Sequence, residues 1–365
     1  MTGPRRTGFA NLPLHYGKAP RWLFERMVPL AREITIAIVS EYGPAEMLRR
    51  LSHPYWFQAF GCVLGFDWHS SGVTTTLCGA LKEGLKGIET DLGLFVAGGK
   101  GKASRQTPAE IADWGEKISL DPAPLVYSSR MAAKVDSAAI QDGYQIYHHS
   151  FVFTAKGEWT VVQQGMNETN HYARRYHWLG ETVADFVNEP HAAILSEARG
   201  ETLNLTAAES APARTTITSI ATEETPEKVL AELRKLKTLD LPARHQIMTS
   251  DLHPDSLKKI ILSAYERQPE DFERLLGLPG VGARTIRALS LISELIHGVV
   301  PSYRDPARYS FAHGGKDGIP YPVDRKTYDR SIELLSRAIS EARLGLSDKQ
   351  QAFNRLNRIR ADIQY

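Results

Sequence analysis

Three carboxylates surround one segment of the chain that is predicted to form a β-hairpin. Asp136 and Asp142 precede the first strand, Glu158 opens the second, and the first strand carries His148 and His149. Divalent-metal nucleases place two or three carboxylates on neighbouring strands, where the bound metal polarises the scissile phosphate and activates water. Because oxygen ligands dominate this set, the expected metal is Mg²⁺ or Mn²⁺. We therefore predict Asp136, Asp142 and Glu158 as catalytic and metal-binding residues of a nuclease.

Two features of the same segment limit this prediction. Side chains of adjacent strand residues point to opposite faces, so at most one of His148 and His149 can join the site unless a bulge intervenes. Restriction-type nucleases place an acidic residue two positions before a lysine on the second strand, whereas this chain reads Glu158-Trp159-Thr160. The metal nuclease site is thus one of several hypotheses.

A second candidate site is a glycine-rich turn between two predicted helices. Residues 275–284 read Leu-Leu-Gly-Leu-Pro-Gly-Val-Gly-Ala-Arg. Glycine gives backbone freedom at the bend, and main-chain amides can converge at the positive end of the second helix, where a phosphate oxygen fits. This pattern resembles the helix-hairpin-helix motif, which binds the DNA backbone without reading sequence; the alternative is a tight turn between core helices. The predicted DNA contacts are Gly280, Val281, Gly282, Ala283, Arg284 and Arg287.

An aspartate downstream of this turn suggests a different chemistry. Pro322-Val323-Asp324 opens a predicted helix and is similar to the element of helix-hairpin-helix DNA glycosylases whose carboxylate assists departure of a flipped base. The spacing from the turn is longer than in those enzymes, so an insertion over about 301–318 must loop out. Arg284 stands where bifunctional glycosylases have a Schiff-base lysine, which excludes lyase chemistry there. The alternative role of Asp324 is a helix N-cap.

Two further glycine-rich loops carry basic residues. Lys100, Lys102 and Arg105 lie in Gly-Gly-Lys-Gly-Lys-Ala-Ser-Arg at 98–105, which lacks the spacing of a nucleotide-binding loop. Lys316 lies in Gly-Gly-Lys-Asp-Gly at 314–318, which could close over a phosphate or form a surface turn. We expect these four residues to contact DNA.

The elements that must position these residues fall into two predicted domains. Residues 1–195 mix a helix over about 20–40 with the hairpin over 144–164, which indicates an α+β domain carrying the chemistry. Residues 196–225 are rich in Ala, Thr, Ser and Glu, the composition of a linker or surface excursion. Residues 226–365 are a succession of helix signatures, which predicts an all-α helix-hairpin-helix domain for DNA binding.

Composition excludes several classes of protein. A chain of 365 residues with 42% hydrophobic and 24% charged residues folds without disulfide bonds, and two cysteines allow no zinc finger. The formal charge is only +2, so any affinity for nucleic acid must come from local patches. Neither a signal peptide nor an apolar run of about 18 residues is present, which predicts a cytoplasmic protein with no membrane partner.

Four separated blocks, 6–27, 60–85, 135–166 and 312–335, resemble a prokaryotic family catalogued as domain of unknown function 763. The resemblance implies a distinctive N-terminal region paired with the helix-hairpin-helix segment, and it implies no activity. We therefore expect a DNA-binding and DNA-processing protein of repair or recombination, most simply a metal-dependent nuclease. The alternatives are a metal-independent base-excision glycosylase that uses Asp324, and a non-catalytic DNA-binding adaptor for a helicase, a nuclease or another repair protein.

Overall fold

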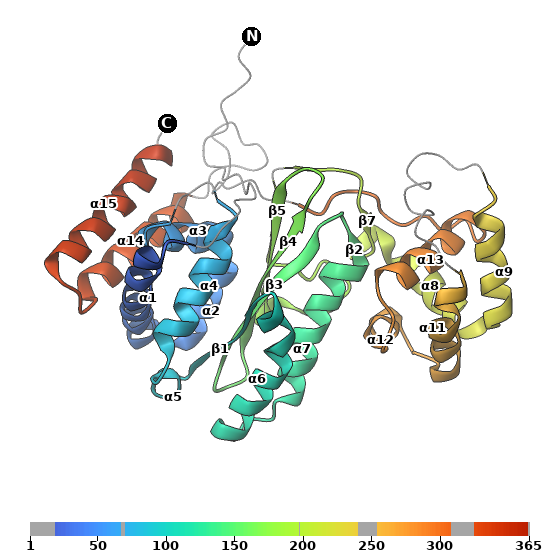
Figure 1. Cartoon of the computed structure of the whole chain (residues 1–365), viewed down its shortest axis with the longest axis horizontal. Helices are drawn as coiled ribbons and strands as arrows, with labels where there is room; N and C mark the ends of the chain where they lie inside the picture. Colours follow the sequence, from blue (N-terminus) through green and yellow to red (C-terminus); the bar gives the residue numbers. More distant parts are fainter. Residues whose placement is uncertain (1–18, 67–69, 197, 240–253, 308–324, 364–365) are drawn as a thin grey trace, which may run out of the picture.

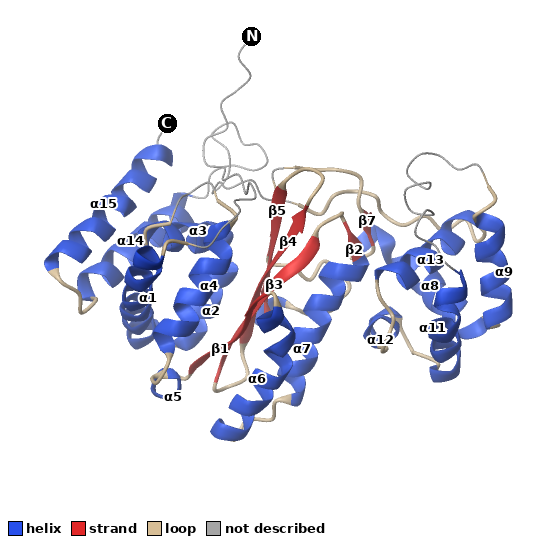
Figure 2. Cartoon of the chain, in the orientation of Figure 1, coloured by secondary structure: helices blue, strands red, loops and turns tan. Residues whose placement is uncertain are grey.

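An antiparallel sheet with the strand order β1-β3-β4-β5-β6 lies at the centre of the molecule (Figures 1 and 2). The computed structural model describes residues 19–66, 70–196, 198–239, 254–307 and 325–363. The strands are β1 (Leu94–Lys100), β3 (Gln145–Thr154), β4 (Trp159–Asn167), β5 (Tyr172–Leu179) and β6 (Ala193–Leu195). A separate pair joins β2 (Ile140–Gln141) to β7 (Leu203–Asn204).

Helices cover both faces of this sheet, so its strands are buried on both sides. In β3, Phe151 and Phe153 belong to one hydrophobic cluster and Val152 belongs to another, as the alternation of strand side chains requires. A strand that is buried on both faces reads as a nearly continuous apolar run. Polar side chains inside these strands are therefore exceptional and mark positions that packing alone does not explain.

The first face, which includes Val152, is covered by helices from both ends of the chain. They are α1 (Arg21–Tyr42), α2 (Pro44–Ser52), α3 (Pro54–Val63), α4 (Gly72–Leu85), α14 (Arg325–Glu341) and α15 (Leu346–Ile363), with the short α5 (Glu89–Leu92) leading into β1. Figure 1 shows α14 and α15 beside α1 and α3 at one end of the molecule.

The second face is covered by α6 (Lys102–Ile118) and α7 (Ala123–Lys134), and a group of helices packs beside α7 (Figure 1). This group consists of α8 (Ala211–Glu223), α9 (Pro226–Leu236), α11 (Pro254–Arg267), α12 (Phe272–Gly277) and α13 (Ala283–Leu295). A π-helical turn, Val135–Ala139, follows α7 directly, and 3-10 turns form at Gly180–Thr182 and Ala208–Ser210.

The structure confirms the coarse sequence prediction of a mixed α and β N-terminal part followed by helices. The predicted hairpin forms β3 and β4, with a register shift between Ile146 and His148. The two cysteines, Cys62 and Cys78, are buried, and they do not form a disulfide bond. In the described part of the chain, every helix is too short or too polar to cross a bilayer.

Two parts of the chain differ from the sequence prediction. The segment 196–225, expected as a linker or surface excursion, contains α8, whose Ala213, Ile217 and Ile220 are buried in the same cluster as the second face of the sheet. The helices after residue 226 do not pack together as one unit, because Leu335 and Ile339 of α14 are buried against the first face. Both differences arise from apolar residues at helical spacing that bury their stripe against distant elements.

Candidate functional site

Asp136 lies in the π-helical turn after α7, and its side chain is fully buried. The indole Nε1 of Trp178 donates a hydrogen bond to Asp136 Oδ2 at 2.9 Å, and the side-chain amide of Gln163 donates to the same oxygen. The other oxygen, Oδ1, lies 2.5 Å from Nε2 of His191. Three donors, from β4, β5 and a loop, therefore bind this one carboxylate. The π-helical turn that carries Asp136 is a helix irregularity that is frequent at functional sites.

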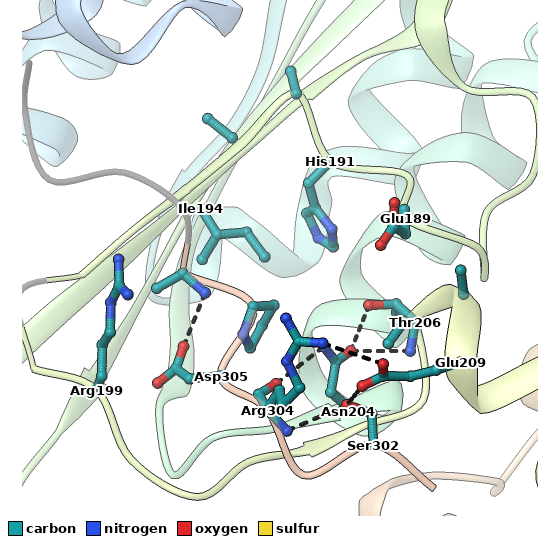
Figure 3. A pocket seen from close by; sticks show the side chains of 16 residues that line it. Glu189, His191, Ile194, Arg199, Asn204, Thr206, Glu209, Ser302, Arg304 and Asp305 are labelled. Atoms are coloured by element: carbon teal, nitrogen blue, oxygen red, sulfur yellow. Dashed lines mark hydrogen bonds and ion pairs between the residues drawn. The ribbon is translucent and has the colours of Figure 1, made fainter. Parts of the chain in front are cut away.

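His191 connects this buried carboxylate to a cavity of about 540 Å³ (Figure 3). His191 follows Pro190 and precedes β6 in the chain. Its ring contacts the indole of Trp178, with ring centroids 4.3 Å apart. Charged and polar side chains surround the cavity, as Figure 3 shows. They are Glu189, His191, Arg199, Asn204, Thr206, Glu209, Ser302, Arg304 and Asp305.

The pair formed by Asp136 and His191 has the geometry of a general base and its orienting carboxylate. Because Nε2 faces Asp136, the second ring nitrogen, Nδ1, is directed away from it, and the residue lines the cavity. A buried carboxylate fixes the tautomer of such a histidine and stabilises the imidazolium that forms when the ring takes a proton. Sequence reasoning identified Asp136 and missed His191.

Asp142 has different partners, although they also lead to the cavity. The Arg174 guanidinium lies 2.9 Å from Asp142 and 2.7 Å from Asp305, and Tyr176 donates its hydroxyl to Asp142 at 2.6 Å. Burial lowers the pKa of Arg174, but the charges of Asp142 and Asp305 outweigh this effect and keep the pKa above its ordinary value. Asp305 lines the cavity, so this buried ion pair forms part of its wall.

The structure does not bring the three predicted metal ligands together. Glu158 lies at the turn after β3 and accepts a hydrogen bond from Thr154 Oγ1 at 2.9 Å, whereas Asp142 lies before the opposite end of β3. A strand of ten residues separates them, which corresponds to about 30 Å. In the ranges that the structure describes, no group of three or more His, Cys, Asp and Glu residues could hold a metal ion. The Mg²⁺ or Mn²⁺ site expected from these residues is therefore not formed.

His148 and His149 point to opposite faces of the sheet, as strand geometry predicts. His149 lies 2.9 Å from Ser129 Oγ and 2.8 Å from Gln163 Oε1, so it joins the network of Asp136 through Gln163. His148 is buried on the other face, and neither of its ring nitrogens has a hydrogen-bond partner. Burial lowers the pKa of His148 to about 3.

A row of polar residues crosses the first face of the sheet. Strand register pairs Lys100 with His148, His148 with Gln164, and Gln164 with Arg175. Only Lys100, at the edge, is exposed. The neighbouring Lys102 and Arg105, also predicted to contact DNA, are exposed in the first turn of α6, so these three predicted basic residues lie together.

The glycine-rich turn between α12 and α13 lies at the surface. Gly280 has a φ of +85° and is exposed, whereas Val281 is buried and anchors the turn. Lys134 at the end of α7 donates a hydrogen bond from Nζ to the carbonyl oxygen of Val281. Gly282 directly precedes α13 with extended backbone, and the first amides of this helix have no acceptor within the helix. These amides are the donors that a ligand at this turn would use.

Two arginines predicted to contact DNA differ in their availability. Arg284 is exposed in the first turn of α13, while Arg287 donates from Nε to Gln141 Oε1 at 2.7 Å. Gln141 also donates to the carbonyl oxygen of Ala283 at 2.9 Å. Because Asp142 follows Gln141 directly, one short segment supports both the turn and the wall of the cavity.

Two predicted residues, Lys316 and Asp324, lie outside the described residues. The helix expected to open at Asp324 is observed as α14, which begins at Arg325.

A model of the family described as protein of unknown function (DUF763) matches residues 8–323. The chain belongs to this family. The match confirms the family suggested by the four sequence blocks, and it extends over the sheet, the cavity and the turn between α12 and α13 of this DUF763 protein. Neither a curated protein nor a solved structure matches the chain.

Proposed function

We propose that this DUF763 protein binds the DNA backbone at the turn between α12 and α13 and hydrolyses a phosphodiester bond in the His191 cavity. The observation that supports the proposal best is the placement of the turn. Gly280 and Arg284 are exposed, Gly282 and Ala283 are half-buried, and Val281 is buried. A DNA phosphate can reach donors at the surface, whereas a turn enclosed between core helices would be shielded from it.

The turn has the physical properties of a phosphate site. Unpaired amides and the helix dipole make the start of a helix favourable for an anion. The structure adds Arg284 on α13 and Lys134 on α7, and a Cβ placed at Gly282 would meet nothing within 4 Å, so the backbone there is open to a close approach. Contacts of this kind fix a protein on the duplex without reading its sequence.

The His191 cavity supplies a general base without a metal ligand set. His191 Nδ1 takes a proton from water, the water oxygen bonds to phosphorus, and the bond from phosphorus to the leaving oxygen breaks. The leaving oxygen lies on the opposite side of phosphorus and takes a proton from water, and the imidazolium returns its proton to solvent. Asp136 stabilises the transient charge on the ring. Arg199 and Arg304 line the same cavity together with Glu189, Glu209 and Asp305. Arg304 lies 3.3 Å from Glu209, so Arg199 is the cation that would meet the substrate phosphate.

A cleavage panel tests this proposal. Flap, nicked and single-stranded DNA are incubated with the protein in the presence of EDTA or of Mg²⁺ or Mn²⁺. We expect cleavage that persists in EDTA and falls at least about 100-fold in His191→Ala, the usual scale for removing a general base. Glu158→Ala is the matched control, because Glu158 lies at the far end of β3.

Other outcomes of the panel point to the other functions. Cleavage that requires Mg²⁺ or Mn²⁺ and is unchanged in His191→Ala would favour the hypothesis of a metal-dependent nuclease. Alkali-labile sites in damaged DNA that require Asp324 would indicate a glycosylase, and binding without turnover would leave an adaptor. Each of these results would contradict the role proposed for His191.

A further inference from the structure

A second cavity lies between α7 and the end of α12, beside the turn that we propose binds DNA. Its volume is about 650 Å³, and its wall is mainly apolar, with Val126, Tyr127 and Met131 from α7 and Gly277 from α12. This volume falls within the range of roughly 300–1,000 Å³ that is typical of small-molecule sites. The cavity can therefore admit one flat organic group.

The charges around this cavity favour an anionic ligand. Arg130 and Lys134 line it, and none of the described residues lining it is acidic. Arg130 is exposed, and Lys134 also contacts the turn through the Val281 carbonyl oxygen. An apolar interior with cations at its border complements a nucleotide, which combines a flat base with a negative phosphate.

The aromatic ring in this wall is held in place by its neighbours. The Tyr127 hydroxyl donates to Glu273 of α12, and the Arg274 guanidinium lies 5.8 Å from the ring centroid. Phe186 meets the same ring edge to face at 5.8 Å. A ring fixed before binding loses little entropy when a base packs against it.

We infer that this cavity receives an unpaired nucleobase of a DNA strand whose backbone is held at the turn between α12 and α13. The inference rests on the proposed function, because the turn must hold the strand that supplies the base. Gly277 ends α12 before the turn, and Lys134 contacts both the turn and the cavity, so the two surfaces are continuous. A bulged base leaves the stack more easily than a paired one, which predicts selectivity for DNA with an unpaired base.

The test compares two DNA probes with the full chain. One is a paired duplex, and the other is the same duplex with a single bulged 2-aminopurine, so that fluorescence anisotropy gives affinity and 2-aminopurine emission reports stacking. We expect the bulged probe to bind roughly 5- to 150-fold more tightly, the contribution of one stacked base, with a change in emission on binding.

Three variants separate this inference from the proposed function. Ala133→Trp fills the cavity from a half-buried position on α7 and should abolish the preference while duplex affinity stays unchanged. Tyr127→Leu leaves the cavity open but removes the aromatic ring, so it should reduce the preference for the bulged probe. It serves as the test if Ala133→Trp does not fold. Ser340→Trp on the distant α14 is the control for an added surface aromatic group and should change neither probe.

The outcomes are distinguishable. Equal affinity of the wild type for both probes, or a preference that survives in both cavity variants, would overturn the inference and leave the proposed function intact. If Gly282→Glu had no effect on either probe, the proposed binding at the turn would itself be wrong.

Discussion

Replacing Asp136 by alanine should destabilise the protein more than replacing Glu158 by alanine. The substitution removes the acceptor of Trp178, Gln163 and His191. Trp178 and Gln163 are fully buried, and each buried donor left without a partner costs about 1–3 kcal/mol. His191 lines the cavity and can be hydrated, so it adds less. We expect Asp136→Ala to lower the free energy of unfolding by about 3–5 kcal/mol.

Denaturant unfolding followed by tryptophan fluorescence measures this loss. Glu158→Ala is the matched control, because it removes a carboxylate with one hydrogen bond, from Thr154, and should cost about 0.5–1.5 kcal/mol. A loss for Asp136→Ala no larger than that of the control would refute the three-donor arrangement around Asp136.

Three further predictions follow from the buried polar groups and the glycine turn. Burial lowers the pKa of His148 to about 3, so as the pH falls the unfolded chain takes up a proton before the folded protein does. The free energy of unfolding should therefore fall by about 1.4 kcal/mol per pH unit below about pH 6.5. His148→Gln should reduce that slope when denaturant titrations are repeated at several pH values. Arg174→Leu leaves Asp142 and Asp305 buried without their cation and should lower stability by about 3–5 kcal/mol, whereas a loss under about 1 kcal/mol would contradict the ion-pair network. Gly280 has a φ of +85°, so Gly280→Val should cost about 1 kcal/mol or more in the same assay; no loss would show that the turn has another conformation.

Sequence patterns predicted the elements whose signals are local. The aromatic and β-branched runs around Lys156 and Gly157 form β3 and β4, and Pro226 lies in the first turn of α9. These signals depend on neighbours in the chain, so the elements can be predicted without knowledge of the tertiary structure.

The stretch interpreted as a linker contained a helical signal that composition concealed. Ala213, Ile217, Ile220 and Ala221 recur at the spacing of one helix face, and all four are buried. Small Ala and Thr residues dominate α8 and suggested a surface segment. Their size instead suits a helix that packs against α11, α12 and α13.

The candidate site could be predicted only in part, because its partners are distant in the sequence. His191 lies 55 residues from Asp136, and Arg174 lies 131 residues from Asp305. Neither pair has a motif or a fixed spacing. Asp136 was identified as chemically significant, but the pattern could not show its contacts with Trp178, Gln163 and His191. Nor could it show that the ten residues of β3 separate Asp142 from Glu158.

The most direct measurement of the central claim is the affinity of two charge variants for duplex DNA over a range of salt concentrations. Gly282→Glu places a carboxylate at the start of α13, and Gly345→Glu places the same charge at the turn between α14 and α15 with backbone and space that permit it. We predict that Gly282→Glu weakens binding to all sequences at least about tenfold and lowers the salt slope by about 1, while Gly345→Glu stays near the wild type. Equal effects of the two variants, or a loss confined to certain sequences, would contradict backbone binding at this turn.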